Sequence, residues 1–243
     1  MNTPSTRTAV IIGASSVIGE ALAHELHRAG WRLGILARRL DRLEALRTRL
    51  PPETIVRGLD VAQPDAASIL KHLLDELGGV DLVIISAGTG HNGVLQWELD
   101  LETVSVNVLG FMAVAHVAMH HFLKRGRGHL VGISSIAALR GNRAAAYAAS
   151  KAFQSVYLDG LREVARHSGH PIVVTEVQPG GVDTAMLKPD RPLPPLVRWL
   201  FVASPEKAAS QIVRAIQKRK KHAYITRRYA PVAFILKLLP RPG

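Results

Sequence analysis

Short apolar runs rich in β-branched residues recur along the chain, and longer amphipathic segments separate them. A continuous run of this kind is typical of a parallel strand that is buried on both faces of its sheet. The predicted strands are 8–12, 33–36, 54–59, 82–85, 130–133 and 172–177, of which 54–59 is the weakest. Such strands require apolar cover on both sides, and this requirement constrains the fold more than any other feature.

The segments between these runs have the spacing of amphipathic helices. The predicted helices are 18–29, 40–50, 65–77, 101–124, 144–167 and 205–220. The alternation predicts an α/β fold, a Rossmann-type doubly wound parallel sheet with helices on both faces. The 243 residues are expected to form one domain over 1–243. The proline-rich stretch 189–195 predicts a loop within a variable substrate segment at about 184–203, with a short helix near 197–202.

Composition narrows the classes of function. The chain has no cysteine, which excludes disulfides and thiolate chemistry and fits a reducing cytoplasm. No signal peptide is recognisable, and no continuous apolar run reaches the roughly 18 residues of a spanning helix, so we expect a cytoplasmic protein. The net charge of +12 indicates a solvated arginine-rich surface or an anionic partner. Because zinc-finger, RNA-binding and zipper patterns are missing, we expect no nucleic-acid module.

A glycine turn joins the first predicted strand to the first predicted helix. It spans residues 13–19, with the sequence Gly-Ala-Ser-Ser-Val-Ile-Gly. Such a turn places backbone N–H groups and the positive end of a helix against a pyrophosphate, so it predicts a dinucleotide site. Val17 departs from the pattern, because a β-branched side chain there would crowd a closely approaching phosphate.

Two arginines follow the second predicted strand, where dinucleotide-binding sheets place the adenine ribose. An acidic residue at this edge would accept from the ribose hydroxyls, whereas arginine favours a 2′-phosphate. Arg38 and Arg39 occupy the position, and no acid follows until Asp41. The arginines therefore predict NADP(H) as the preferred cofactor, with NAD(H) as the less favoured alternative.

Tyr147 and Lys151 lie four residues apart early in the predicted helix 144–167. This spacing puts both side chains on one helical face. A nearby ammonium stabilises phenolate, so we expect Lys151 to lower the pKa of Tyr147. A tyrosine of this kind can exchange a proton with a carbonyl or alcohol oxygen near neutral pH.

Further motifs accompany the glycine turn and the tyrosine–lysine pair in order along the chain. They are Asp60-Val61, Ser86-Ala87-Gly88, Asn107, Ile133-Ser134-Ser135, Pro179-Gly180 and Val182-Asp183-Thr184. With these motifs the chain resembles the short-chain dehydrogenase/reductase family over nearly its whole length. The resemblance implies an NADP-dependent oxidoreductase that interconverts a carbonyl and an alcohol by hydride transfer.

The resemblance also implies a role for each matching residue. The catalytic residues would be Asn107, Ser135, Tyr147 and Lys151. Tyr147 would be the general acid and base, Lys151 would hold the nicotinamide ribose, and Ser135 would hydrogen-bond the reacting oxygen. Asn107 would hold a water in a proton relay. The cofactor contacts would be Gly13, Ser15, Ser16, Val17, Ile18, Gly19, Arg38, Arg39, Asp60, Val61, Ala87, Gly88, Asn107, Tyr147, Lys151, Pro179, Gly180, Val182 and Thr184.

The match to the family has three departures. Val17 stands where the family usually has glycine, and Ser86 stands where it usually has asparagine. The segment from Ser135 to Tyr147 is one residue shorter than is typical, which leaves either Ser134 or Ser135 as the catalytic serine. We favour Ser135, with the deletion absorbed in the loop 140–143. An inactive relative that binds a dinucleotide or a partner is therefore the alternative to an active enzyme.

Two other features allow competing interpretations. His116, His120 and His121 share one predicted helix, but no further ligand is clearly placed, so we expect no metal site. In the resembled family this helix and the tyrosine-bearing helix commonly form a dimer interface, so we expect a homodimer or homotetramer.

The segment 229–240 is amphipathic and follows a basic stretch. We expect it to pack on the protein as a pocket lid or subunit contact, with weak attachment to a membrane surface as the alternative. Leu95, Trp97, Met186, Leu187, Leu193 and Trp199 favour an apolar carbonyl or alcohol substrate.

Overall fold

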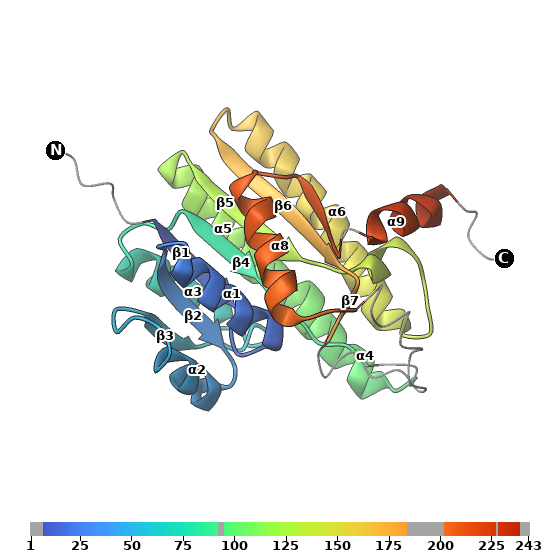
Figure 1. The fold of residues 1–243 in the computed structure, drawn as a ribbon, viewed down its shortest axis with the longest axis horizontal. Coiled ribbons are helices and arrows are strands. Elements are labelled where there is room, and N and C mark those ends of the chain that lie inside the picture. The colour runs from blue at the N-terminus through green and yellow to red at the C-terminus, as the bar shows by residue number, and fades with distance from the viewer. Residues whose placement is uncertain (1–6, 92–94, 184–201, 227, 239–243) are drawn as a thin grey trace.

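The computed structural model describes residues 7–91, 95–183, 202–226 and 228–238. Seven parallel strands form the central sheet in the order β3-β2-β1-β4-β5-β6-β9 (Figure 1). The strands are β1 (Thr8–Ile12), β2 (Arg32–Ala37), β3 (Ile55–Gly58), β4 (Leu82–Ile85), β5 (Gly128–Ile133), β6 (Ile172–Pro179) and β9 (His222–Ile225). The order reverses between β1 and β4, as expected of a doubly wound sheet, so the predicted fold class is confirmed.

Helices cover both faces of the sheet. They are α1 (Val17–Arg28), α2 (Leu40–Arg47), α3 (Ala66–Glu76), α4 (Trp97–Val104), α5 (Phe111–Arg125), α6 (Ala145–His167), α8 (Pro205–Gln217) and α9 (Tyr229–Leu238). One core cluster packs α1, α2 and α8 on the sheet, and a second packs α3, α5 and α6 on the opposite face. Each predicted helix is present, with ends that differ by a few residues.

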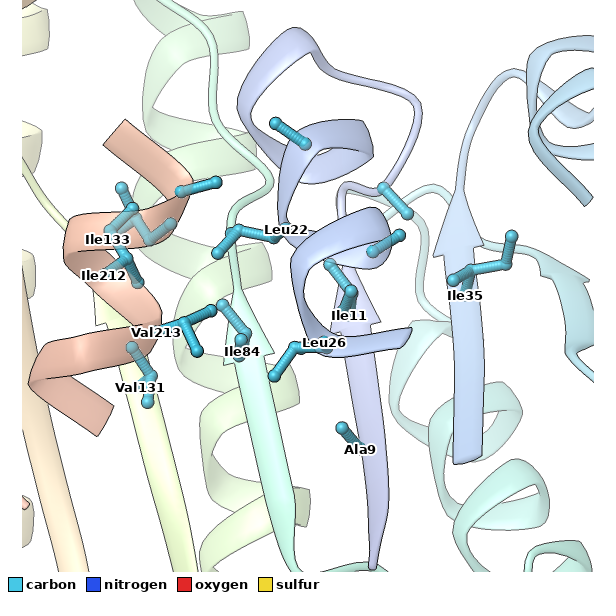
Figure 2. Packing of buried hydrophobic residues seen from close by; sticks show 14 of the residues in the cluster. Ala9, Ile11, Leu22, Leu26, Ile35, Ile84, Val131, Ile133, Ile212 and Val213 are labelled. Atoms are coloured by element: carbon cyan, nitrogen blue, oxygen red, sulfur yellow. The ribbon is translucent and has the colours of Figure 1, made fainter. Parts of the chain in front are cut away.

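Apart from edge strand β3, in which no residue is buried, the apolar runs are largely buried on both faces, as their composition predicts. All five residues of β1 are buried, and successive side chains enter opposite cores. On one face, Leu22 and Leu26 of α1 and Ile212 of α8 pack over the strands (Figure 2). This packing brings the carboxyl ends of β1, β4, β5 and β6 to one edge of the sheet, where loops gather.

The sequence patterns missed three strands. β9 pairs with β6 at the edge of the sheet, and its residues alternate between exposed and buried. Because it is short and follows a basic stretch, it has no continuous apolar run to reveal it. A separate pair joins β7 (Gly181–Val182) to β8 (Val202–Ala203). Val202 is therefore in a strand rather than in the short helix expected near 197–202, and 197–201 lie outside the described residues.

One helix is longer than predicted. Helical structure is continuous from Trp97 to Arg125, through a π-helical segment, η1 (Ser105–Gly110), that joins α4 to α5. By length and mean hydropathy it is long and apolar enough to cross a membrane, which the search for continuous apolar runs did not anticipate. Its inner face, including Phe111 and Phe122, fills the core beneath the sheet. Burial against the sheet therefore accounts for its apolar inner face.

Candidate active site and dinucleotide cleft

Two adjoining cavities lie at the carboxyl ends of the central strands. The larger has a volume of about 550 Å³ and the smaller about 210 Å³. Five residues line both, namely Ser15, Ser16, Arg39, Ser86 and Gly88. A crevice at the point where the strand order reverses is the usual ligand site of a doubly wound sheet. The two cavities together form one elongated cleft.

The glycine turn is shaped by its first and last residues. Gly13 has φ of +93°, and a Cβ atom there would lie 2.4 Å from the backbone nitrogen of Ala87. A Cβ atom on Gly19 would lie 2.3 Å from the Gly13 carbonyl oxygen. Ser16 caps α1 by accepting a hydrogen bond from the Gly19 amide at 3.0 Å. These contacts hold the positive end of α1 against the cleft, where an anion is favoured.

Val17 does not strain this turn. It begins α1, and among the described residues Arg219 is the one non-glycine residue with positive φ. The conformation at position 17 therefore requires no glycine. The Val17 side chain is 44% exposed and lines the larger cavity beside Ile18. The crowding expected from Val17 thus concerns the side chain alone and not the backbone.

Three arginines, Arg38, Arg39 and Arg42, gather where the two cavities meet. Arg39 donates to the carbonyl oxygen of Ser15 at 2.8 Å and to its hydroxyl at 3.3 Å. Burial, followed by the charges of Arg42 and Arg38, lowers the pKa of Arg39. An anion placed among these guanidinium groups would relieve their mutual repulsion. Arg38 itself lies 3.9 Å from Glu102, with its side chain 64% exposed.

The smaller cavity collects the remaining predicted contacts at this end. Asp60, Val61, Ala87 and Gly88 line it. The Asp60 carboxylate accepts from the amide of Ala62 at 3.1 Å, which fixes the loop after β3. The structure thus places these residues on one cavity, and their contact with a cofactor stays a prediction.

The tyrosine and lysine lie on adjacent turns of α6, at the opposite end of the cleft. The Lys151 ammonium is 5.7 Å from the centre of the Tyr147 ring. The Ser135 hydroxyl lies beside Tyr147 and accepts from the amide of Ala137 at 3.1 Å. The structure thus brings Ser135, Tyr147 and Lys151 to one wall of the larger cavity.

Ser134 is turned away from the tyrosine. Its hydroxyl donates to the buried carboxylate of Glu176 at 2.6 Å. This geometry favours Ser135 over Ser134 as the serine that meets a reacting oxygen. The loop 140–144 spans the shortened segment between Ser135 and Tyr147.

Burial sets the proton affinities of Tyr147 and Lys151. It raises the pKa of Tyr147, and the neighbouring Ser135 hydroxyl lowers that pKa by less. Burial also lowers the pKa of Lys151 to about 7. The expected lowering of the tyrosine pKa by Lys151 is therefore not found in the protein alone, because the lysine is itself strongly desolvated.

Asn107 lies in the π-helical segment η1 and is fully buried. Its side-chain oxygen accepts from the Thr89 amide at 2.9 Å, and its side-chain nitrogen donates to the Thr89 carbonyl at 2.7 Å and to Ser150 at 3.0 Å. Its backbone carbonyl accepts from Gln154 at 2.9 Å. These atoms already have protein partners, so Asn107 positions the Thr89 loop and lines neither cavity.

The start of the C-terminal helix forms part of the larger cavity. Tyr229 lines it, and its hydroxyl accepts from the Gly181 amide at 3.1 Å. Its ring covers Gly180 so closely that a Cβ atom there would lie 1.8 Å from a ring carbon. Pro179, Gly180 and Val182 line the same cavity. Thr184 lies outside the described residues.

Several residues of the cleft escaped the sequence patterns. Arg42 and Glu102 line it, and Gly90 approaches so closely that a Cβ atom there would lie 2.3 Å from the Tyr147 ring. The glycine after a strand end was a usable signal for Gly90, whereas nothing local marks Glu102. By contrast, Leu95 and Trp97 are exposed and line neither cavity. The other residues expected to contact an apolar substrate lie within 184–201, outside the described residues.

The histidines do not gather into a site. His116 and His120 stack with ring centres 6.4 Å apart, while His121 accepts from the Val80 amide at 3.4 Å. Within the described part of the chain, no three histidine or acidic side chains lie close enough to hold a metal ion.

Comparison with known proteins identifies a family. The model of the short chain dehydrogenase family matches residues 7–193. An uncharacterized oxidoreductase of Myxococcus xanthus is 40% identical over 190 residues, which cover 75% of this chain and 74% of the relative.

Two solved structures show similar folds. An alcohol dehydrogenase from Thermococcus sibiricus, complexed with 5-hydroxy-NADP, superposes with a TM-score of 0.76 at 25% identity, covering 90% of this chain and 96% of that one. A 3-ketoacyl-(acyl-carrier-protein) reductase from Brucella melitensis, complexed with NADH, has a TM-score of 0.80 at 20% identity with the same coverage of both chains. Structures of this fold thus include complexes with both kinds of nicotinamide cofactor.

Proposed function

The chain belongs to the short-chain dehydrogenase family, and on this premise we propose that it is an NADP(H)-dependent oxidoreductase that interconverts a carbonyl and an alcohol. One observation carries the proposal. A tyrosine, a serine and a lysine line one wall of a cleft that also holds a glycine turn, a helix N-terminus and an arginine cluster. The cleft therefore combines a proton donor with a site for an anionic dinucleotide.

The residues of the cleft fit such a dinucleotide. Gly13 and Gly19 let the backbone of the turn close tightly, and the amides of the first turn of α1 have the positive potential that a pyrophosphate requires. Asp60 and Val61 line the adenine end. Pro179, Gly180 and Val182 line the nicotinamide end. When bound, the reduced nicotinamide supplies the hydride that a carbonyl carbon accepts.

The proton chemistry falls to the residues of α6 and β5. Tyr147 donates its phenolic proton to the carbonyl oxygen in reduction and takes it back in oxidation. The Ser135 hydroxyl donates a hydrogen bond to the same oxygen, where negative charge develops. Lys151 in its charged form favours the phenolate over the phenol, so it assists the transfer from beneath the ring.

The arginines support a preference for NADP(H). Arg38 and Arg39 line the smaller cavity beside the edge of the sheet where the adenine ribose binds in dinucleotide folds. Guanidinium groups pair with phosphate oxygens through two parallel hydrogen bonds. A tenfold preference requires about 1.4 kcal/mol, which one such contact supplies.

The larger cavity supports an apolar substrate. The side chains of Val17, Ile18, Ile136 and Tyr229 line the same cavity as Ser135. An apolar wall with a few convergent polar groups is typical of a pocket for a small organic ligand. A bulky or aliphatic ketone or aldehyde fits this description better than a charged metabolite.

Exposed apolar side chains support assembly through the outer faces of η1, α5 and α6. Leu109 of η1 is 57% exposed and Val156 of α6 is 71% exposed, and Met112 of α5 and Val164 of α6 are also exposed. Apolar surface of this kind marks an interaction site. We therefore propose a homodimer or homotetramer, which sedimentation equilibrium would detect.

The test is NADPH oxidation with a panel of ketones, aldehydes and acyl thioesters. We expect turnover that depends on the carbonyl compound and is slower with NADH at equal low concentration. A protein that binds NADPH but turns over no member of a broad panel would instead support the inactive relative.

A further inference from the structure

Gln154 lies behind the catalytic pair, one turn beyond Lys151 on α6. It is fully buried, and both ends of its side-chain amide are hydrogen-bonded. The amide oxygen accepts from the Lys151 ammonium at 2.9 Å, and the amide nitrogen donates to the Asn107 carbonyl at 2.9 Å. These two partners also determine the orientation of the amide, because in a flipped amide the NH2 group would face the Lys151 ammonium, which is also a donor.

The hydrogen bond from Gln154 is made to a backbone carbonyl group of the π-helical segment η1. The amide of Phe111, which would pair with Asn107 in an α-helix, donates to Val106 instead. The Asn107 carbonyl then receives the Gln154 amide, while the Asn107 side chain holds Thr89. The lysine is thus tied to the loop that passes over the catalytic tyrosine.

The donors of Lys151 can be counted. An ammonium has three. One donates to the carbonyl of Ile133 at 3.2 Å and a second to Gln154. One is left for the side of the lysine that lines the larger cavity near Tyr147. Both inner donors are therefore occupied by fixed protein acceptors.

Among the residues that the structure describes, no carboxylate takes part in this arrangement. Burial alone accounts for the lowered pKa of Lys151. Glu176, a buried carboxylate on the neighbouring strand β6, is engaged by Ser134, Gln178 and His222. Around the ammonium, Tyr147 is the titratable partner, and Gln154 and Ile133 supply neutral acceptors.

We propose that Gln154 is a positioning residue, whose amide aims the Lys151 ammonium at Tyr147 and fills the place between Lys151 and Asn107 that a relay water would need. The inference rests on the proposed oxidoreductase function. Because an amide does not pass protons as water does, the tyrosine regains its proton from the cleft side. The sequence expectation of a water held by Asn107 is replaced by this direct contact.

The experiment compares Gln154→Met and Gln154→Glu in the full chain. Methionine keeps the length of the side chain but removes the acceptor, whereas glutamate replaces the acceptor with a charged one. For Gln154→Met we expect kcat at neutral pH to fall by at least about tenfold, since a hydrogen bond to a charged group is lost, while KM changes by less than about threefold.

The pH profile separates positioning from stability. In carbonyl reduction, the alkaline limb of the curve of kcat against pH reports loss of the proton from the tyrosine–lysine pair. It should move to lower pH by about one unit in Gln154→Met, because the ammonium loses an acceptor, and to higher pH in Gln154→Glu, because it gains an anion. Gln178→Met is the matched control, since it removes one buried amide contact to Glu176 and should lower Tm without moving the limb.

A direct titration works without turnover. The Lys151 side-chain nitrogen can be followed by NMR in the ligand-free protein, with Lys151→Met to assign the signal. If the pKa of Lys151 shifts in opposite directions in the two Gln154 variants, the inference is supported even if no substrate is found. The inference can therefore be tested separately from the proposed function. An unmoved titration, or shifts of the same sign in both variants, would overturn it.

Discussion

At the arginine end of the cleft the charged side chains are exposed, as with Arg38 at 64%, whereas at the end that holds Tyr147 the side chains of Lys151 and Gln154 are buried. Solvent and salt screen the exposed charges, so each contributes a modest increment. A buried polar group has few partners and no water to replace them, so its loss costs more. Substitutions at the catalytic end should therefore have the larger effects, and the following predictions test this contrast.

The largest effect is expected for Tyr147→Phe. Loss of the phenolic proton should reduce kcat by about a thousandfold, within the usual range of general acid catalysis. NADPH affinity should change by less than about threefold, because the hydroxyl contributes little to dinucleotide binding. Stopped-flow turnover and fluorescence titration measure the two quantities. Substantial residual turnover would place the proton donor elsewhere.

The two serines give the next largest effect and an internal control. Ser135→Ala should lower kcat by about a hundredfold, since it removes a donor to the reacting oxygen. Ser134→Ala should cost mainly stability, because its hydroxyl serves Glu176 and removing it leaves a buried carboxylate short of one donor. The reverse ranking in kcat would show that Ser134 is the catalytic serine.

Tyr229 tests whether the C-terminal helix belongs to the catalytic end. Tyr229→Ala should raise KM for the carbonyl compound by about tenfold, because its ring covers Gly180 and its hydroxyl holds Gly181. Tyr229→Phe keeps the ring and should cost only a few-fold, as expected of one neutral hydrogen bond. Equal, near-normal kinetics for both variants would mean that α9 is not part of the substrate pocket.

The arginines should change selectivity more than rate. Arg39→Ala should erase most of an about tenfold preference for NADPH over NADH, and Arg38→Ala should erode it less, because Glu102 lies beside Arg38. Titrating both cofactors into the Tyr147→Phe background measures affinity without turnover. Raising the salt concentration should weaken the preference in the parent protein. Equal affinity for both cofactors in the parent protein would contradict the assignment.

Val17→Gly should have the smallest effect. The backbone at Val17 is already helical, so glycine relieves no strain there. The substitution removes only the crowding of the phosphate by the valine side chain. We expect NADPH to bind a few-fold more tightly, offset in stability by up to about 1 kcal/mol for glycine in a helix. Unchanged or weaker binding, measured by calorimetry, would show that the turn already accommodates valine.

Local patterns predicted most of the fold and the cleft. The apolar runs located the strands from β1 to β6, because a strand buried on both faces needs a continuous run, and β3, which is not buried, had the weakest run. The glycine turn and the Tyr147–Lys151 spacing are equally local, since one turn or one helix carries all their residues. β9 was missed because an edge strand alternates over only four residues.

Other parts of the site depend on contacts between distant segments. Tyr229 meets Gly181 across 48 residues, and Gln154 meets Asn107 across 47. The choice between Ser134 and Ser135 depended on the strand that carries Glu176, 42 residues further along. The sequence by itself thus determined which residue types and elements this protein has, because those follow from short-range spacing. Only the tertiary structure decided which buried polar groups become partners, because such groups must find hydrogen bonds wherever the packed chain brings a donor to an acceptor.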